Sequence, residues 1–417
     1  MHNKVFARSL AVALSAFFVL SVGVGLSSLN AQAQAPDVYK VGILTDMSGP
    51  YSAMGGPGSL VAAKMALEDC LKAECKGMKI ELLSADHQNK ADIGASKARE
   101  WLDRDKVDAI ADLTNSSVAL AVQRLIRDKG GIAMYSGPAT TVLTNAECAA
   151  NGFHWMFDTY SQAAGAAAAL TRMGEKSWYF VTVDYAFGQS LEKDAGNVVK
   201  SLGGSVVGSV RHPLNASDLS SFLLQAQSSK AQVIGLANGG QDTVNAIKQA
   251  RSFGVGSKNQ RLAALLVFLS DVHALGLNDA HGLVYTDGFY WDFDNDTRQF
   301  SKRFEALDKG SKPTMVHAGV YSSVYHYLKA AAATKSHDWK VVSQKMREIP
   351  IQDAVMRNAS IRPDGRVIHD MYLYQVKTPA ESKAPWDYLK LLSTIPAQQA
   401  FKPMDGSCSL TPLAIKH

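Results

Sequence analysis

The sequence predicts an α/β protein built from two halves of similar design, each on a parallel β-sheet. Short apolar runs alternate with amphipathic helical segments, and this alternation restarts after residues 153–159. Apolar runs bounded by turn residues are typical of parallel strands buried on both faces. With 417 residues, 47% of them apolar, the chain can bury a large core. A length of this order suggests about two to three domains.

The first half of the alternation predicts four strands with three helices between them. The strands are expected at residues 39–46, 78–86, 107–113 and 131–136. The helices are expected at residues 55–72, 91–105 and 116–130. The last helix ends in Lys and Gly, as helix C-termini often do. Successive β-α units favour an open sheet with right-handed crossovers.

The second half predicts a second sheet of similar build. Its strands are expected at residues 177–184, 204–213, 231–238, 261–270 and 282–290. Helices are expected at residues 186–203, 218–230 and 239–254. The chain then becomes helical between about residues 296 and 349, and it closes with strands at 371–376 and 387–395.

The N-terminus is typical of a secretory signal peptide. A short basic start precedes a long apolar run, and "NAQAQA" offers cleavage after Ala33 or Ala35. An uncleaved membrane anchor is the alternative, but the small residues at the exit favour cleavage. No later stretch is apolar over the length that a spanning helix needs. We therefore expect residues 1–35 to be removed and the mature chain to be periplasmic.

Four cysteines follow the leader: Cys70, Cys75, Cys148 and Cys408. An even number in an exported chain suggests disulfides, although four cysteines allow more than one connectivity. The short spacing of Cys70 and Cys75 favours a local bridge, which would leave Cys148 to pair with Cys408. A metal site is the rival interpretation, but the spacing lacks a second close pair of ligands.

Composition and motifs argue against several classes of function. The formal net charge is +5, and the basic residues are mixed with acids throughout, so no nucleic-acid surface is expected. The chain contains no H-E-x-x-H, no G-x-S-x-G and no dinucleotide-binding fingerprint. Its eleven histidines are scattered. We therefore expect neither a metal nor a cofactor, and nothing supports an enzyme.

Six predicted strand ends are small, polar and partly aromatic. In open α/β sheets ligands bind at the carboxyl ends of the strands, where helix N-termini present free N–H groups. Any one such end is more often an ordinary helix cap than a site. Several at one edge, carrying aromatic side chains, favour a binding cleft. The ends are residues 47–56, 113–120, 135–141, 183–189, 236–242 and 286–292, and their aromatic residues include Tyr51, Tyr185, Phe187, Phe289, Tyr290 and Trp291.

Taken together, residues 41–69, 105–122, 131–144 and 181–204 resemble the type I periplasmic solute-binding proteins of branched-chain amino acid ABC importers. The resemblance covers essentially the mature chain. It implies two Rossmann-like lobes joined by three crossovers, with a ligand cleft that closes on binding. It also implies a monomer that delivers a small molecule to an inner-membrane permease and catalyses nothing. The expected division is residues 36–158 plus 287–349 for lobe I, 159–286 plus 350–395 for lobe II, and a tail, 396–417, returning to lobe I.

The resemblance also assigns the ligand contacts. The turns after the third and fourth strands would bind a ligand carboxylate, and an aromatic side chain from the second lobe would close over the ligand. Phe289 and Tyr290 could equally pack in the hinge or core. The expected ligand-binding residues are Tyr51, Thr114, Asn115, Ser116, Ser117, Ser136, Pro138, Ala139, Thr140, Tyr185, Asn238, Gly239, Phe268, Phe289 and Tyr290.

One departure from the family pattern bears on the ligand. Amino-acid-binding members place a carboxylate in a second-lobe loop, but this chain has Phe268 and Leu269 there, with only Asp271 nearby. Asp184 or Asp287 could substitute. A buried ammonium without a partner is costly. We therefore expect a small carboxylate, an aromatic or branched aliphatic acid, ahead of a free amino acid.

Three alternatives stay open. The first is a binding protein for branched-chain or aromatic amino acids. The second is a ligand-sensing receptor domain of the same fold, which would report to a signalling membrane protein. The third, from a different class, is an exported α/β hydrolase, for which Ser116 or His154 would be candidates.

Overall fold

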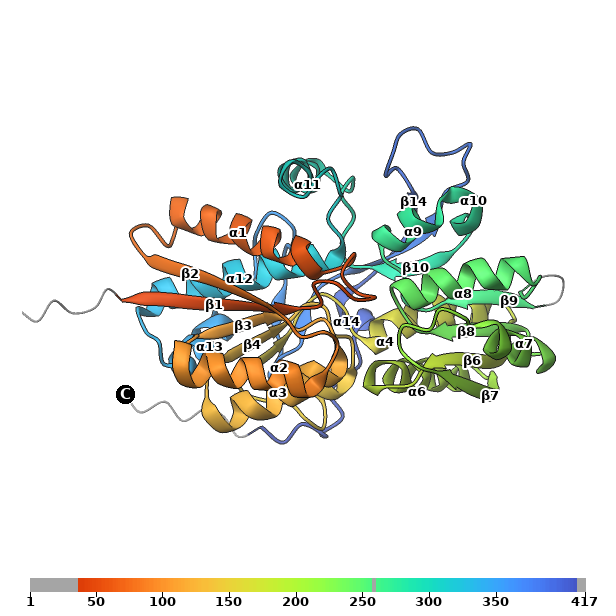
Figure 1. Cartoon of the computed structure of the whole chain (residues 1–417), viewed down its shortest axis with the longest axis horizontal. Helices are drawn as coiled ribbons and strands as arrows, with labels where there is room; N and C mark the ends of the chain where they lie inside the picture. The colour runs from red at the N-terminus through yellow and green to blue at the C-terminus, as the bar shows by residue number, and fades with distance from the viewer. Residues whose placement is uncertain (1–36, 257–259, 411–417) are drawn as a thin grey trace, which may run out of the picture. The chain divides into compact units, whose positions relative to one another are not determined.

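The computed structural model describes residues 37–256 and 260–410 (Figure 1). The predicted signal peptide lies outside the described residues. The described residues from Val38 onward form one compact unit. Within the two described ranges, none of the helices combines the length and the apolar character needed to cross a membrane.

The first sheet is parallel throughout, with strand order β2-β1-β3-β4-β5. Its central strands are buried on both faces. Helices α1 (Gly56–Lys72) and α12 (Met315–Thr334) pack together, as do α2 (Ala91–Glu100) and α3 (Ser116–Lys129), and α1, α12 and α3 contact the strands (Figure 1). This explains why these strands read as nearly continuous apolar runs. The strands are β1 (Val38–Thr45), β2 (Lys79–Asp86), β3 (Ala109–Asp112), β4 (Ile132–Tyr135) and β5 (Gly152–His154).

The predicted helices of this half are present, with one change. The expected helix at 91–105 is α-helical only to Glu100, and residues Trp101–Asp105 continue as a π-helical turn. The Trp101 ring fills the space above Gly42, where a Cβ would lie 2.4 Å from it. The helices are α1 (Gly56–Lys72), α2 (Ala91–Glu100), α3 (Ser116–Lys129), α12 (Met315–Thr334) and α13 (Trp339–Glu348).

The second sheet is also parallel, with strand order β7-β6-β8-β9. We call the first sheet with its helices the first lobe, and the second sheet with its helices the second lobe. The second-lobe strands are β6 (Ser177–Val183), β7 (Ser205–His212), β8 (Val233–Ala237) and β9 (Arg261–Ala264), and the main helices are α6 (Ala186–Ser201), α7 (Ser220–Ser228) and α8 (Gln241–Ser252).

Two expectations for the second sheet are wrong. The strand expected at 261–270 ends at Ala264, and Leu269–Leu275 form helix α9. The intervening residues are buried and apolar although they are not a strand, so the apolar pattern does not mark the strand end. The strand within 282–290, β10 (Val284–Asp287), does not join the parallel sheet. It pairs antiparallel with β13 (Met371–Val376), which pairs with β14 (Leu389–Ile395).

Shorter elements complete the fold. A parallel bridge between His154 and Arg366 brings the β11-β12 hairpin beside β5. The division of the chain into lobes at the expected residue boundaries stays a prediction. The remaining elements are α4 (Thr159–Gln162), α5 (Ala168–Arg172), α10 (Leu277–Ala280), α11 (Asn295–Leu307), α14 (Ala397–Ala400), β11 (Ser360–Ile361), β12 (Val367–Ile368), the 3-10 turn η2 (Thr141–Thr144) and the π turn Ala163–Ala167.

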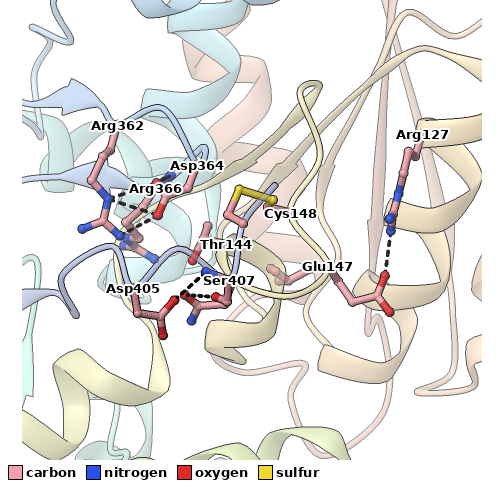
Figure 2. Close-up of a disulfide and its surroundings, with 12 residues drawn as sticks. Arg127, Thr144, Glu147, Cys148, Arg362, Asp364, Arg366, Asp405 and Ser407 are labelled. Atoms are coloured by element: carbon pink, nitrogen blue, oxygen red, sulfur yellow. Dashed lines mark hydrogen bonds and ion pairs between the residues drawn. A yellow bond between two sulfur atoms is a disulfide. The ribbon is translucent and has the colours of Figure 1, made fainter. Parts of the chain in front are cut away.

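The favoured cysteine pairing is confirmed. Cys70 bonds to Cys75 at the end of α1, and Cys148 bonds to Cys408 across 260 residues of sequence (Figure 2). Ser407 beside the second bridge donates a hydrogen bond to Asn145. The C-terminal segment is thereby attached to the loop that follows η2. This loop comes soon after residues 136–141, which we call the "SGPATT" turn.

Candidate functional site

The strand ends of the first sheet are linked by a cluster of buried hydroxyls. Thr45 Oγ1 lies 2.6 Å from Thr114 Oγ1, which joins the ends of β1 and β3. The backbone amides of Ala139 and Thr140 both donate to Ser116 Oγ, each at 3.3 Å. The "SGPATT" turn after β4 is therefore held against the start of α3 by one serine hydroxyl.

Helix α3 begins inside this cluster. Asn115 is its N-cap, and the Asn115 side chain accepts hydrogen bonds from the amides of Ser117 at 2.9 Å and Val118 at 3.2 Å. Ser116 is buried at the first position of the helix, and Ser117 is half-buried. The start of a helix carries partial positive charge, so this corner of the first lobe is suited to an anion.

Beneath the hydroxyls lies a strained turn that the sequence did not predict. Asp112 and Leu113, at the end of β3, have φ angles of 76° and 59°. Consecutive non-glycine residues in this region are uncommon and concentrate at functional sites. Asp112 is fully buried and accepts a hydrogen bond of 2.6 Å from Ser59 Oγ. Burial raises the pKa of Asp112 to about 6, although the Ser59 hydroxyl acts to lower it.

The two lobes meet at a pair of tyrosines. Tyr51, from the loop after β1, and Tyr185, the N-cap of α6, place their hydroxyl oxygens 2.6 Å apart. Nearby, the amide of Gln241 donates to the carbonyl oxygen of Pro50 at 3.1 Å. Burial raises the pKa of both tyrosines, so both hydroxyls are neutral, and either one can donate the hydrogen bond to the other. The strand-end loops of the two sheets are therefore in direct contact.

The close approach at Pro50 requires a glycine. Gly240 has a φ of 59°, and a Cβ added there would lie 2.5 Å from the Pro50 carbonyl oxygen. Asn238, two residues before Gly240, is buried. Its side chain accepts a hydrogen bond from Thr243 Oγ1 at 2.7 Å, and its Nδ2 lies 3.1 Å from His212 Nε2. The Asn238 side chain is therefore hydrogen-bonded within the second lobe.

A second inter-lobe contact involves residues that the sequence did not single out. Ser190 and Asp194 of α6 face the threonines of the first-lobe turn. Thr141 Oγ1 donates to Asp194 Oδ2 at 3.0 Å. Both α6 residues lie in mid-helix, where polar side chains are commonly solvated, so no sequence signal identifies them.

The three carboxylates that the sequence offered as ammonium partners each have another role. Asp184 is more than half exposed and pairs with Arg211 at 3.2 Å. Asp271 is buried and accepts from the amide of Phe268 at 3.0 Å, and burial raises its pKa to about 7. Asp287 accepts from a backbone amide two residues on, at 2.9 Å, and burial raises its pKa to about 8.

Another buried carboxylate lies near the tyrosine pair. Asp242 accepts hydrogen bonds from the amides of Asn215 and Ala216, both at 3.1 Å. Burial raises the pKa of Asp242 to about 6. Its charge also acts to raise the pKa of Tyr51 and Tyr185, although burial contributes most.

Residues 289–291, which follow β10 and which we call the "FYW" segment, make packing contacts. The Phe289 ring lies edge-on to Phe300, with centroids 5.9 Å apart. The Tyr290 hydroxyl and the Trp291 indole N–H both donate to the carbonyl oxygen of Trp386, at 3.2 and 2.8 Å. These contacts favour the packing alternative for the segment, and ligand contact by Phe289 or Tyr290 stays a prediction.

The predicted residues therefore fall into groups. Hydrogen bonds connect Ser116 with Ala139 and Thr140, and Tyr51 with Tyr185. Others point elsewhere: Ser136 Oγ lies 3.5 Å from Ser323 Oγ of α12, and the Pro138 carbonyl oxygen lies 2.8 Å from His154 Nε2. Phe268 contacts Phe157 edge-on, and Gly239 lies against the Phe187 ring.

Comparison with known proteins identifies the family. The sequence profile of the family described as "Periplasmic binding protein" matches residues 38–383. The chain belongs to this family. A periplasmic binding protein from Burkholderia mallei is 49% identical, with a TM-score of 0.86, over 89% of this chain and 98% of that one. A periplasmic ligand-binding protein of a branched-chain amino acid ABC transporter from Burkholderia xenovorans LB400 is 40% identical, with a TM-score of 0.77, over 88% and 97%.

A curated relative agrees with this assignment. The Leu/Ile/Val-binding protein homolog 6 of Brucella melitensis is 26% identical over 74% of this chain and 79% of its own length. Periplasmic binding proteins of this class serve ABC transporters and bind a small molecule, so this family member is a binding protein and not an enzyme. The hydrolase alternative is therefore wrong. In keeping with this, Ser116 Oγ accepts hydrogen bonds from two backbone amides, and His154 Nε2 contacts the carbonyl oxygen of Pro138.

Proposed function

We propose that this periplasmic binding protein captures a small carboxylate, an aromatic or branched aliphatic acid, between its lobes and delivers it to an ABC permease. The observation that carries the proposal is the chemical asymmetry of the two sets of strand-end loops that meet there. Buried hydroxyls and a helix start lie on the first-lobe side, and the Tyr185 and Phe187 rings lie on the second-lobe side.

The first-lobe half is suited to the carboxylate. Ser116 lies at the start of α3 with its hydroxyl against the Ala139 and Thr140 amides. A carboxylate entering here would accept hydrogen bonds from hydroxyl and amide donors, and hydrogen bonds to an ionised group are the stronger kind. The helix start adds favourable charge without any cation.

The second-lobe half is suited to an uncharged ligand body. The Tyr185 hydroxyl contacts the Tyr51 hydroxyl of the first lobe, and the Phe187 ring lies beside the Tyr185 ring, with centroids 5.9 Å apart. Asp184, Asp271 and Asp287 are each bonded to another group, so an ammonium group entering between the lobes would have to replace one of these partners. Burying an unpaired ammonium costs several kcal/mol.

A second candidate is a free amino acid, favoured by Asp242. The charge of this carboxylate acts to raise the pKa of both tyrosines of the inter-lobe contact, and the hydrogen bonds that it accepts among the described residues come from two backbone amides. The Burkholderia xenovorans relative is described as part of a branched-chain amino acid transporter. If Asp242 reaches the ligand, it would supply the ammonium partner that the loop at Phe268 lacks.

Thermal unfolding of the mature chain against a ligand panel decides between the two. The panel contains leucine, phenylalanine, isovalerate, benzoate and 4-hydroxybenzoate. A Rhodopseudomonas palustris solute-binding protein of the same fold was solved with 4-hydroxybenzoate, although at 22% identity the likeness extends to the fold alone. A ligand at about 100 times its dissociation constant stabilises by about 2.7 kcal/mol.

The proposal expects the acids without an amine to raise the melting temperature and the amino acids to leave it unchanged. Stabilisation by leucine or phenylalanine alone would overturn the ligand class and favour Asp242 as the ammonium partner. An Asp242→Asn variant then separates the two outcomes, since it abolishes binding of an amino acid and spares binding of a simple acid.

A further inference from the structure

Three threonine hydroxyls from the first-lobe turn and the adjoining crossover converge on two side chains of α6. Thr140 Oγ1 donates to Ser190 Oγ at 3.1 Å, and Thr159 Oγ1 lies 3.0 Å from the same oxygen. Asp194 Oδ2 accepts from Thr141 Oγ1 at 3.0 Å and from Thr159 Oγ1 at 2.5 Å. Ser190 and Asp194 are four residues apart, so they occupy one face of the helix.

This cluster is removed from water. Ser190 and Asp194 are buried, as are the three threonines. Burial raises the pKa of Asp194, and the Thr159 and Thr141 hydroxyls act to lower it. A carboxylate that is desolvated in this way is costly unless hydrogen-bond donors are provided. Thr141 lies in the first-lobe turn, so its hydrogen bond to Asp194 crosses between the lobes, whereas Thr159 lies in α4, which packs against α6. Closure of the lobes therefore adds the Thr141 donor to the donor that Thr159 supplies.

We infer that Asp194, supported by Ser190, is a positioning residue that holds the Thr140–Thr141 turn in its ligand-binding arrangement and stabilises the closed cleft. The inference rests on the proposed function in that this turn is the proposed carboxylate site. Asp194 itself acts through the threonines. Its place in mid-helix, more than two turns after Tyr185 at the N-cap, separates it from the strand-end edge where the ligand would lie.

The chain supplies a matched control on the same helix. Glu192 also accepts one threonine hydroxyl, from Thr182 Oγ1 at 2.6 Å, but Thr182 belongs to β6 in the same lobe. Asp194→Asn and Glu192→Gln therefore remove the same charge from the same helix. They differ in whether the hydrogen bond crosses between the lobes.

The test is hydrogen–deuterium exchange of the ligand-free mature chain. The reporters are the amides of Val142, Leu143 and Asn145, whose hydrogen bonds stay within the η2 turn. Asp194→Asn is expected to speed their exchange about tenfold, the value of one charge-assisted hydrogen bond. Glu192→Gln is expected to leave it unchanged. Unchanged exchange in Asp194→Asn, or an equal rise in both variants, would overturn the inference.

Variants of the partner distinguish positioning from general destabilisation. Thr141→Val keeps the shape and removes the donor, so it should match Asp194→Asn, and the double variant should be no faster than either single one. Thr141→Ser keeps a hydroxyl and should restore slow exchange. Additive effects, or no rescue by serine, would contradict the inference. Ser190→Ala, expected to give a smaller rise, provides the measurement if Asp194→Asn does not fold.

A ligand measurement completes the test and keeps it separate from the proposed function. The dissociation constants of 4-hydroxybenzoate and leucine are measured for the wild type, Asp194→Asn and Glu192→Gln. Whichever probe binds the wild type should bind Asp194→Asn about tenfold more weakly and Glu192→Gln equally well. Equal binding to Asp194→Asn would overturn the positioning role. If neither probe binds the wild type, the proposed ligand class fails, and the exchange result still decides the inference.

Discussion

The two lobes have similar sheets but bring different chemistry to the cleft. In the first lobe, buried hydroxyls and a helix start lie at the strand ends, above the strained turn at Asp112. In the second, the strand ends carry Tyr185 and Phe187, and the carboxylate of Asp271 accepts a hydrogen bond from a nearby backbone amide.

This difference teaches that a repeated architecture leaves each half free to recognise a different part of one ligand. In the proposed mode of binding, the first lobe would provide donors for a charged end, which requires exact placement of amides and hydroxyls. The second lobe would provide surface that covers an apolar body, which requires closure. The first contribution depends on local hydrogen bonds, and the second depends on the approach of Pro50 to Gly240.

Blocking closure is expected to have the largest effect on binding. In Gly240→Ala the new Cβ would lie 2.5 Å from the Pro50 carbonyl oxygen, so the second lobe cannot reach its closed position. We expect affinity for the acid that binds the wild type to fall about 1000-fold, or ~4 kcal/mol, by calorimetric titration. Gly203→Ala is the control, because Gly203 also has a positive φ, 74°, but no atom of the described residues lies within 4 Å of its Cβ position. Equal losses in both variants would contradict the closure argument.

Two buried carboxyls, Asp112 at the end of β3 and Asp287 at the end of β10, should be distinguishable by pH. A carboxyl whose pKa is raised by folding binds its proton more tightly in the native state, so the free energy of unfolding falls as pH rises from the unfolded to the folded pKa. For Asp112 this window runs from about pH 4 to about 6, and for Asp287 from about pH 4 to about 8.

Asp112→Asn should therefore flatten the dependence below pH 6, and Asp287→Asn should flatten a wider range that extends to pH 8. The expected gain in stability for Asp112→Asn at pH 7 is at most about 3 kcal/mol, because a shift of one pKa unit is worth about 1.4 kcal/mol and the lost Ser59 hydrogen bond offsets part of it. Urea unfolding at a series of pH values measures both. A loss of stability in Asp112→Asn at pH 7 would show that its hydrogen bonds outweigh its desolvation.

The sequence predicted the parallel sheets from local periodicity and the Cys70–Cys75 bridge from close spacing, and the Cys148–Cys408 bridge followed as the remaining pair. It did not predict where β9 ends, since residues 265–268 are buried and apolar without being a strand. It also assigned β10 to the parallel sheet, because an apolar run carries no information about the direction of its neighbour.

For the site, strand-end composition pointed to the loops of Ser116 and Tyr51, which the structure joins by hydrogen bonds to Thr140 and Tyr185. Asp194 could not be predicted, because its role arises from a partner more than fifty residues away. Contacts between lobes are tertiary, and no spacing rule within one helix reports them.

The smallest expected effect separates two serines of the first lobe that the sequence treated alike. Ser116→Ala leaves the buried amides of Ala139 and Thr140 without their acceptor, and the affinity for the bound acid should fall about tenfold. Ser136→Ala should change it little, because Ser136 Oγ contacts only Ser323 Oγ, at the limiting distance of 3.5 Å, among its side-chain hydrogen bonds in the described part of the chain. Calorimetric titration of both variants measures the difference. If Ser136→Ala proves the more damaging, the carboxylate lies nearer β4 and α12 than α3, and the anion site must be moved away from the helix start.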